Sequence, residues 1–189
     1  MDLSRLKAAW RIIMVYILLT DGFEEIEALT PVDVLRRCGA QLLTAAVSEK
    51  QVRGSHAVTV EADITIDEID KNNMEMLILP GGPGHTGLKT EKVHSLIRYA
   101  AEHDIYIASI CAAPSVIGEL GLLKNRRATC FPGYESALSG AVISTDKVVC
   151  DGKFITARGA GAASEFAFAL AELLCGEKKA DEIKNAMQY

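Results

Sequence analysis

Short apolar runs with almost no polar interruption recur along the chain, and segments with helical periodicity separate them. Runs of this kind are typical of strands that are buried on both faces, and their alternation with helices predicts βαβ units in a mostly parallel sheet. The expected strands are residues 13–19, 41–47, 76–79, 104–110, 127–130 and 141–144. We therefore expect an α/β fold with helices on both faces of the sheet.

Helical periodicity fills the intervals between these strands. It predicts helices over residues 24–38, 91–103, 114–120, 164–175 and 178–187, with an interruption at Pro31. Three of these helices end directly before a glycine, which is a common helix-stop signal. Residues 56–66 alternate polar with apolar side chains and predict a solvent-facing ribbon at the edge of the sheet. Asp151 and Gly152 lie between two apolar runs and predict a tight hairpin turn, a second small addition to the core.

The composition indicates a globular protein of one domain. Of the 189 residues, 49% are apolar and 24% are charged, which is ordinary usage for a chain with a buried core. The net charge of -5 provides no basic surface for phosphate backbones and argues against nucleic acid as the main partner. Five cysteines without a CxxC pair argue against a disulfide scaffold or a zinc site and favour a reducing, cytoplasmic setting.

The N-terminal residues resemble a signal peptide only superficially. Arg5, Lys7 and Arg11 precede an apolar run that ends in TDGFEE, without small-residue cleavage chemistry. The run is shorter than the roughly 20 residues that span a bilayer, so no membrane association is expected. We interpret residues 1–13 as an extension outside the core and residues 14–189 as a single domain, with Met14 as a candidate native start.

The segment SICAAPS, residues 109–115, places Cys111 directly after an expected strand and directly before an expected helix. This is the layout of a nucleophile elbow, in which small neighbours such as Ser109 and Ala113 permit a tight turn. Pro114 suits the first helical turn. The helix dipole and nearby amides favour a thiolate, so Cys111 is the candidate nucleophile. The alternative is a buried, inert cysteine, which is the preferred interpretation for the other four.

A second candidate loop, LPGGPGHTG at residues 79–87, follows another expected strand. Gly81 and Gly82 let the backbone approach a ligand closely and direct amides at an anion, as in an oxyanion hole. The loop lacks the Lys and Ser/Thr of a phosphate-binding P-loop, and a simple sharp turn is the alternative. His85 in this loop is expected to be a solvated turn residue.

Three acidic residues, Glu24, Glu25 and Glu27, occupy the first turn of the helix expected after the first strand. Acidic residues are favourable at a helix N-terminus, so solvated positions are expected for two of them. Glu27 differs because apolar residues flank it, and burial would raise its pKa so that it keeps a proton to donate. Glu24 lies one turn from Glu27 and is expected at the same loop edge, where it would contact the substrate.

Four segments together resemble the ThiJ/PfpI superfamily and, within it, the branch of the Parkinson-linked deglycase. They are GFEEIEALTPVDVLRRCG, LILPGGPG, SICAAPSVIGELGLL and ITARGAGAASEFAFAL. The resemblance covers residues 14–187 with matching order and spacing. It implies a flavodoxin-like three-layer α/β/α sandwich that forms a homodimer, and we expect neither a cofactor nor a bound metal.

The resemblance also implies roles for single residues. It places Cys111 on the reactive, oxidation-prone cysteine of the family and Glu27 on the glutamic acid that hydrogen-bonds this cysteine. Gly82 and Ala112 fall where backbone amides face the substrate. Gly159 falls in a loop that borders the pocket.

Three positions depart from the pattern of relatives. His56 aligns with a pocket-side arginine and is therefore expected to contact the substrate. Phe131 replaces a histidine that many relatives carry before a proline. Ala112 replaces the histidine that follows the nucleophile in protease-like branches, so a Cys-His-acid triad and peptidase activity are not expected.

The function implied is that of a glyoxalase or deglycase, in which Cys111 and Glu27 act on a small carbonyl substrate such as methylglyoxal or on its adducts. The alternative is an oxidative-stress sensor or chaperone in which Cys111 is oxidised to sulfinic acid, because both functions need an accessible thiol. A flavin-binding protein is disfavoured, since the loop after the first strand is acidic and the fold alone does not fix function.

Overall fold

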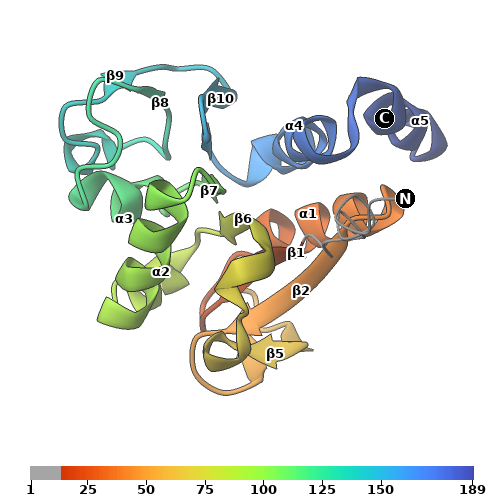
Figure 1. Ribbon diagram of the computed structural model, residues 1–189, viewed down its shortest axis with the longest axis horizontal. Helices are drawn as coiled ribbons and strands as arrows, with labels where there is room; N and C mark the ends of the chain where they lie inside the picture. Colours follow the sequence, from red (N-terminus) through yellow and green to blue (C-terminus); the bar gives the residue numbers. More distant parts are fainter. Residues whose placement is uncertain (1–13) are drawn as a thin grey trace, which may run out of the picture.

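A seven-stranded sheet forms the middle of the protein, of which the computed structural model describes residues 14–189 (Figure 1). The strand order is β10-β11-β7-β6-β1-β2-β5, and all neighbours are parallel except β10 and β11. This order is that of a flavodoxin-like sheet, as expected. The strands are β1 (Met14–Leu19), β2 (Gln41–Ala46), β5 (Ile64–Thr65), β6 (Met74–Leu79), β7 (Tyr106–Ile110), β10 (Val148–Asp151) and β11 (Phe154–Ala157).

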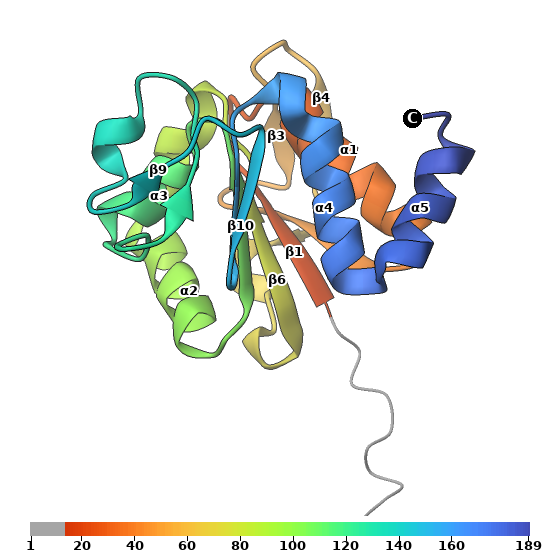
Figure 2. The same ribbon diagram turned by 90° about the horizontal axis from the view of Figure 1, so that it is seen from above.

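Helices cover both faces of this sheet, which confirms the three-layer sandwich (Figure 2). One layer contains α1 (Glu25–Arg37), α4 (Ala163–Cys175) and α5 (Glu177–Ala186). The other contains α2 (Glu91–Glu102) and α3 (Pro114–Glu119). Short 3-10 helices join these elements at η1 (Ile66–Glu68), η2 (Lys71–Asn73), η3 (Pro83–Leu88), η4 (Glu135–Ala137) and η5 (Ala160–Ala162).

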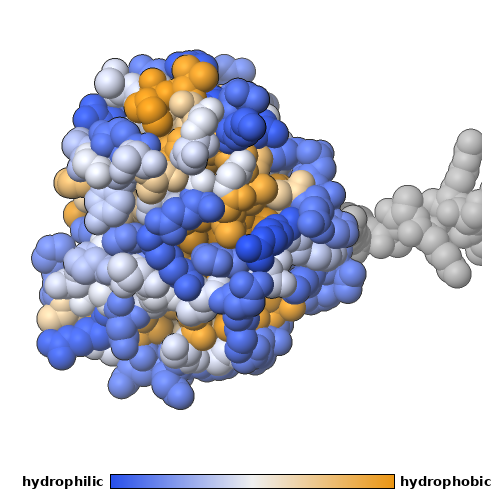
Figure 3. Space-filling model, turned by 90° about the vertical axis from the view of Figure 1, so that its left-hand side faces the viewer, coloured by the Kyte–Doolittle hydropathy of each residue, from blue (hydrophilic) through white to orange (hydrophobic). Residues whose placement is uncertain are grey.

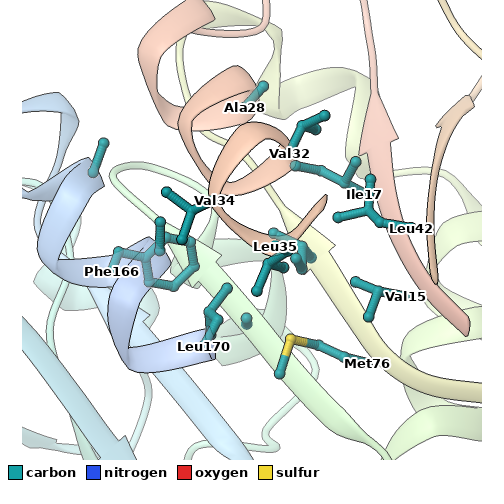
Figure 4. Close-up of a cluster of buried hydrophobic side chains, with 14 of the residues drawn as sticks. Val15, Ile17, Ala28, Val32, Val34, Leu35, Leu42, Met76, Phe166 and Leu170 are labelled. Atoms are coloured by element: carbon teal, nitrogen blue, oxygen red, sulfur yellow. The ribbon is translucent and has the colours of Figure 1, made fainter. Parts of the chain in front are cut away.

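The larger hydrophobic core lies between the sheet and the layer of α1 and α4. Figure 4 shows Val34 and Leu35 of α1 pointing toward Phe166 and Leu170 of α4, above apolar side chains of the sheet such as Met76. Each of these five residues is fully buried. Burial of a side chain of this size contributes about 1.5–3 kcal/mol, so this core holds α1 and α4 in fixed positions on the sheet.

Two small sheets lie outside the central one. β3 (Gln51–Arg53) and β4 (Thr59–Glu61) form the antiparallel ribbon expected from residues 56–66, although the end of that segment, β5, joins the edge of the central sheet. β8 (Arg127–Ala128) and β9 (Val142–Ile143) pair only with each other, so these two predicted strands are not part of the core sheet.

Two further differences concern predicted turns. The hairpin at Gly152 is confirmed, but β11 pairs with β7 inside the central sheet rather than being an addition to it. The predicted interruption at Pro31 is wrong, because α1 continues through this residue. Pro31 removes only the hydrogen bond that its N–H would donate to the Glu27 carbonyl, while burial of Val32 and Leu35 in the core keeps the helix in place.

On the side of the molecule that faces the viewer in Figure 3, polar residues predominate, and apolar residues gather in patches between them. Val142 and Ile143 of β9 are among the exposed large apolar residues.

Within residues 14–189, no helix has the length and apolar character needed to cross a membrane. The predicted N-terminal extension, residues 1–13, lies outside the described residues.

Candidate active site

Cys111 occupies a strained turn between β7 and α3. Its φ angle of 66° lies in the left-handed region, which costs a residue other than glycine on the order of 1–3 kcal/mol. Two backbone hydrogen bonds hold the turn: the Cys111 N–H donates to the Ala157 carbonyl at 2.9 Å, and the Phe131 N–H donates to the Cys111 carbonyl at 2.8 Å. The predicted nucleophile elbow is therefore present, with a partly exposed cysteine at its tip.

The carboxyl group of Glu27 lies against this cysteine. Glu27 is only 1% exposed, although it belongs to the first turn of α1. Its Oε2 accepts a hydrogen bond from the Gly81 N–H at 3.0 Å. The carboxyl group also interacts with the Cys111 thiol and with the Ala160 N–H. Four separate parts of the chain thus meet at one buried carboxyl group.

Gly81 has a different role from the one predicted. We expected its amide to face a bound anion, but this N–H donates to Glu27. A Cβ atom at position 81 would lie 2.6 Å from the Cys111 Cβ and 2.7 Å from the Glu27 Oε2. Only glycine fits between the acid and the thiol, because atoms at these distances overlap.

The amides of Gly82 and Ala112 remain in the predicted positions. Both N–H groups donate to the Cys111 sulfur. Gly82 has a φ angle of 85°, a conformation that glycine adopts without strain. Ala112 is itself buried, so it offers the sulfur its backbone and no side chain. Together these two donors form a small pocket for negative charge on the sulfur or on an atom bonded to it.

Burial raises the pKa of Glu27 to about 7. The hydrogen bond with Cys111 acts in the opposite direction, and the nearby negative charge of Glu24 raises the pKa further. This agrees with the expectation of a carboxyl group that retains a proton near neutral pH. Such a group is able both to donate and to accept a proton under these conditions.

Burial also raises the pKa of the Cys111 thiol to about 12, and the negative charge of Glu27 raises it in the same direction. The Gly82 and Ala112 amides only partly offset this effect. The sequence predicted that the helix dipole and nearby amides favour a thiolate. Desolvation of the sulfur outweighs the effect of these amides. Cys111 and Glu27 form a coupled pair, whose first proton leaves near neutral pH.

The acidic residues next to Glu27 hold the β3–β4 ribbon. Glu25 is buried, contrary to the expectation of a solvated position, and its Oε1 accepts the His56 N–H at 2.7 Å. The His56 Nδ1 lies 2.9 Å from Glu25 Oε2 and 3.9 Å from Glu24 Oε1. Although burial opposes it, hydrogen bonding to His56 and Ser55 lowers the pKa of Glu25 to about 2.

Glu24 and His56 were predicted to contact substrate. The Glu24 carboxylate instead caps α1 by accepting the Glu27 N–H at 2.8 Å, and His56 extends into solvent with 73% of its side chain exposed. The ligand atoms of Glu24, Glu25 and His56 lie within 4.8 Å of one another, which makes them the candidate metal ligands in the part of the chain that the structure describes. Hydrogen bonds with Ser55 and His56 already satisfy the carboxylate of Glu25.

Sequence reasoning missed His85. Its side chain is buried rather than solvated, its Nδ1 lies 2.9 Å from the Gly82 carbonyl oxygen, and its ring packs edge-on against Tyr134 at 5.3 Å. His85 thus supports the loop that carries the Gly82 amide. Gly159 lines a surface cavity of about 430 Å³ together with the half-exposed ring of Phe131. Cys111 and Glu27 are not among the residues that line this cavity, so the role of Gly159 at a substrate pocket stays a prediction.

Residues 14–173, which contain all of the side chains described above, match the DJ-1/PfpI family. The chain belongs to this family. It is 36% identical over 172 residues to the DJ-1 homolog B of Arabidopsis thaliana, an alignment that covers 89% of the chain. That relative is longer, and the chain spans only 39% of its length.

Other DJ-1/PfpI members match along most of their length. The chain is 30% identical to a glutathione-independent glyoxalase of Caenorhabditis elegans, with 85% of the chain and 87% of that protein covered. It is 29% identical to a deglycase of Pyrococcus abyssi, with 78% and 90% covered. The crystal structure of Drosophila melanogaster DJ-1beta superposes with a TM-score of 0.89 at 31% identity, covering 93% of this chain and 97% of that one.

Proposed function

We propose that the chain is a cysteine-dependent enzyme of the glyoxalase or deglycase type, acting on 2-oxoaldehydes such as methylglyoxal or on their adducts. The observation that carries the proposal is the contact between the Cys111 thiol and the Glu27 carboxyl group, whose pKa of about 7 suits proton transfer in both directions. Family members that are named glyoxalase and deglycase support the same type of reaction.

The first step needs the sulfur as a nucleophile. The Glu27 carboxylate first accepts the proton of the Cys111 thiol. The reactive form then carries the proton on Glu27 and the negative charge on Sγ, where the Gly82 and Ala112 amides stabilise it. The sulfur attacks the aldehyde carbon and forms a C–S bond. The proton of Glu27 moves to the aldehyde oxygen, which yields a hemithioacetal and leaves Glu27 as a carboxylate.

Glu27 then acts as a base. It removes the proton from the carbon that carries sulfur and returns it to the neighbouring carbon, while the hydroxyl proton of the hemithioacetal moves to the oxygen on that neighbouring carbon. These transfers convert the hemithioacetal into a thioester of a 2-hydroxy acid. Water cleaves the C–S bond, releases the acid and restores the thiol. The net reaction adds one water molecule to the 2-oxoaldehyde and needs no oxidant or reductant.

The test is the formation of lactate from methylglyoxal by the purified protein. Cys111→Ser is expected to lower kcat by at least about 100-fold, because a serine hydroxyl is a much weaker nucleophile at neutral pH. Cys150→Ser, which replaces an exposed cysteine on β10, is the matched control and should retain the parental rate. Parental lactate production by Cys111→Ser would contradict the mechanism.

An oxidative-stress sensor is the second candidate function. A sulfinic acid on Cys111 would meet the Gly82 and Ala112 amides and a Glu27 carboxyl group that can be protonated near neutral pH. Mild peroxide treatment followed by intact-mass measurement tests this function. Selective gain of two oxygens at Cys111 supports it, and an unmodified Cys111 argues against it. The homodimer and the cytoplasmic location stay predictions from the sequence.

A further inference from the structure

Cys38 and Cys175 come together at the end of the sheet opposite to Cys111. Cys38 caps the C-terminal end of α1, and Cys175 is the last residue of α4. Their thiol groups interact directly, although the two cysteines are far apart in sequence. Both line one surface cavity of about 250 Å³. Val15 and Glu75, near the starts of β1 and β6, lie in the wall of the same cavity.

The two thiols differ in accessibility. Cys38 is 8% exposed, whereas Cys175 is only partly buried. Burial raises the pKa of Cys38 to about 11. Burial raises the pKa of Cys175 as well, but the hydrogen bond from Cys38 and the charge of Lys179 act in the opposite direction. Cys175 is therefore the thiol that an oxidant in solution reaches and attacks first.

We propose that Cys38 and Cys175 form a second redox site, a dithiol that hydrogen peroxide converts into a disulfide. The Cys175 sulfur attacks one peroxide oxygen, the O–O bond breaks, and a sulfenic acid and one water molecule form. The Cys38 sulfur then attacks the Cys175 sulfur, the S–O bond breaks, and a second water molecule leaves. The two thiols lose two protons and two electrons in total, and one peroxide molecule accepts them.

This disulfide would connect the two helices that carry the catalytic end of the fold. α1 and α4 lie side by side on the same face of the sheet (Figure 2). The N-terminal end of α1 carries Glu27. Ala160, whose N–H contacts Glu27, is the first residue of η5, the 3-10 helix that precedes α4. A covalent link between the opposite ends of these helices restricts their separation in the unfolded chain and stabilises the folded protein.

The experiment uses the full chain with Cys111→Ser, so that oxidation of Cys111 does not interfere. After treatment with hydrogen peroxide, we expect a loss of two hydrogens by intact mass and a peptide that contains Cys38 linked to Cys175. The midpoint of thermal unfolding should rise by roughly 5–15 °C and return to its starting value on addition of dithiothreitol.

Two further variants control for other cysteines. Cys175→Ser should abolish both the linked peptide and the thermal shift, whereas Cys150→Ser, an exposed cysteine of β10, should preserve both. Addition of oxygens to Cys175 without any linked peptide would overturn the proposal. So would a thermal shift of the same size in the Cys175→Ser variant. Neither outcome depends on lactate formation, so this site and the proposed function are tested separately.

Discussion

Glu25 and Glu27 lie two residues apart in the same turn of α1, yet their surroundings shift their pKa values in opposite directions. Glu25 faces the β3–β4 ribbon and has a pKa of about 2, whereas Glu27 faces Cys111 and has a pKa of about 7. Both side chains are largely removed from solvent. Burial alone therefore does not decide the charge of a carboxyl group.

The difference lies in the hydrogen-bond donors that each carboxyl group meets. Glu25 accepts from the His56 N–H and from the Ser55 hydroxyl, and it pairs with the His56 imidazole. Glu27 meets the Gly81 and Ala160 amides and a thiol, with the negative charge of Glu24 nearby. Glu25 therefore stays ionised over most of the pH range and holds the β3–β4 ribbon, whereas Glu27 exchanges its proton near neutral pH.

The largest expected effect is a difference in kcat between variants of Glu27 and of Glu25. Glu27→Gln retains the shape of the side chain but removes the acid, so kcat for lactate formation should fall by about 10²–10⁴-fold. Glu25→Gln should change kcat by less than about tenfold, because Glu25 touches no reacting atom. Steady-state kinetics of both variants with methylglyoxal measure this contrast. Equal losses in the two variants would show that the two carboxyl groups do not have distinct roles.

The contributions of Glu27 and Glu25 to the free energy of unfolding should change with pH in opposite directions. The raised pKa of Glu27 means that the folded protein holds this proton more tightly, so its stabilisation is complete below pH 4.5 and is lost as the pH rises to 7. The loss amounts to about 3 kcal/mol. The lowered pKa of Glu25 stabilises the protein above pH 4.5, and this contribution is lost as the pH falls toward 2.

Urea unfolding of the parent and both variants across this pH range measures these contributions. Relative to the parent, Glu27→Gln should gain stability as the pH rises from 4.5 to 7, because the cost of burying a charge disappears. Glu25→Gln should lose stability relative to the parent as the pH rises from 2 to 4.5. Parallel curves for the two variants would argue against opposite pKa shifts.

Substitutions at two glycines, Gly81 next to Glu27 and Gly54 next to Glu25, should have smaller effects and test the same difference between the two acids by steric overlap. A Cβ at Gly81 would overlap Glu27 and Cys111, and a Cβ at Gly54 would overlap the Glu25 side chain. Gly81→Ala and Gly54→Ala should each lower the free energy of unfolding by about 1–3 kcal/mol, but only Gly81→Ala should also lower kcat. Gly161→Ala is the control, since no atom lies within 4 Å of the added carbon. Unchanged kcat in Gly81→Ala would contradict the close packing of the acid and the thiol.

The smallest effect is expected at His56. Its imidazole pairs with Glu25 but is mostly exposed, so water and salt screen the interaction. His56→Gln should shift the midpoint of thermal unfolding by less than about 3 °C, because the backbone N–H of residue 56 still binds Glu25. A large loss of kcat in this variant, measured with methylglyoxal, would return His56 to the substrate-binding role predicted for it.

The sequence alone predicted the parts of the molecule that depend on local pattern. The apolar runs of β1, β2, β6 and β7 identified the sheet, and the segment around Cys111 identified the elbow, because each signal lies within a few neighbouring residues. The apolar residues on either side of Glu27, together with the family resemblance, distinguished it from Glu24 and Glu25 as the candidate proton donor.

Interactions between distant segments were not predictable in the same way. The burial of Glu25 depends on a ribbon about thirty residues later, and that of His85 depends on Tyr134 in another loop. Cys38 and Cys175 meet only because α1 and α4 end at the same side of the core. The pKa of Cys111 was mispredicted because the sequence shows which donors surround a thiol but not how much water it loses.

The backbone conformation of Cys111 has a consequence for directed evolution. A left-handed residue is most easily accommodated as glycine, so a library selected purely for heat resistance would enrich glycine at position 111. A library selected for turnover would keep the cysteine and accept the conformational penalty. Sequencing the survivors of both selections would measure directly how much robustness the protein gives up for reactivity at this one position.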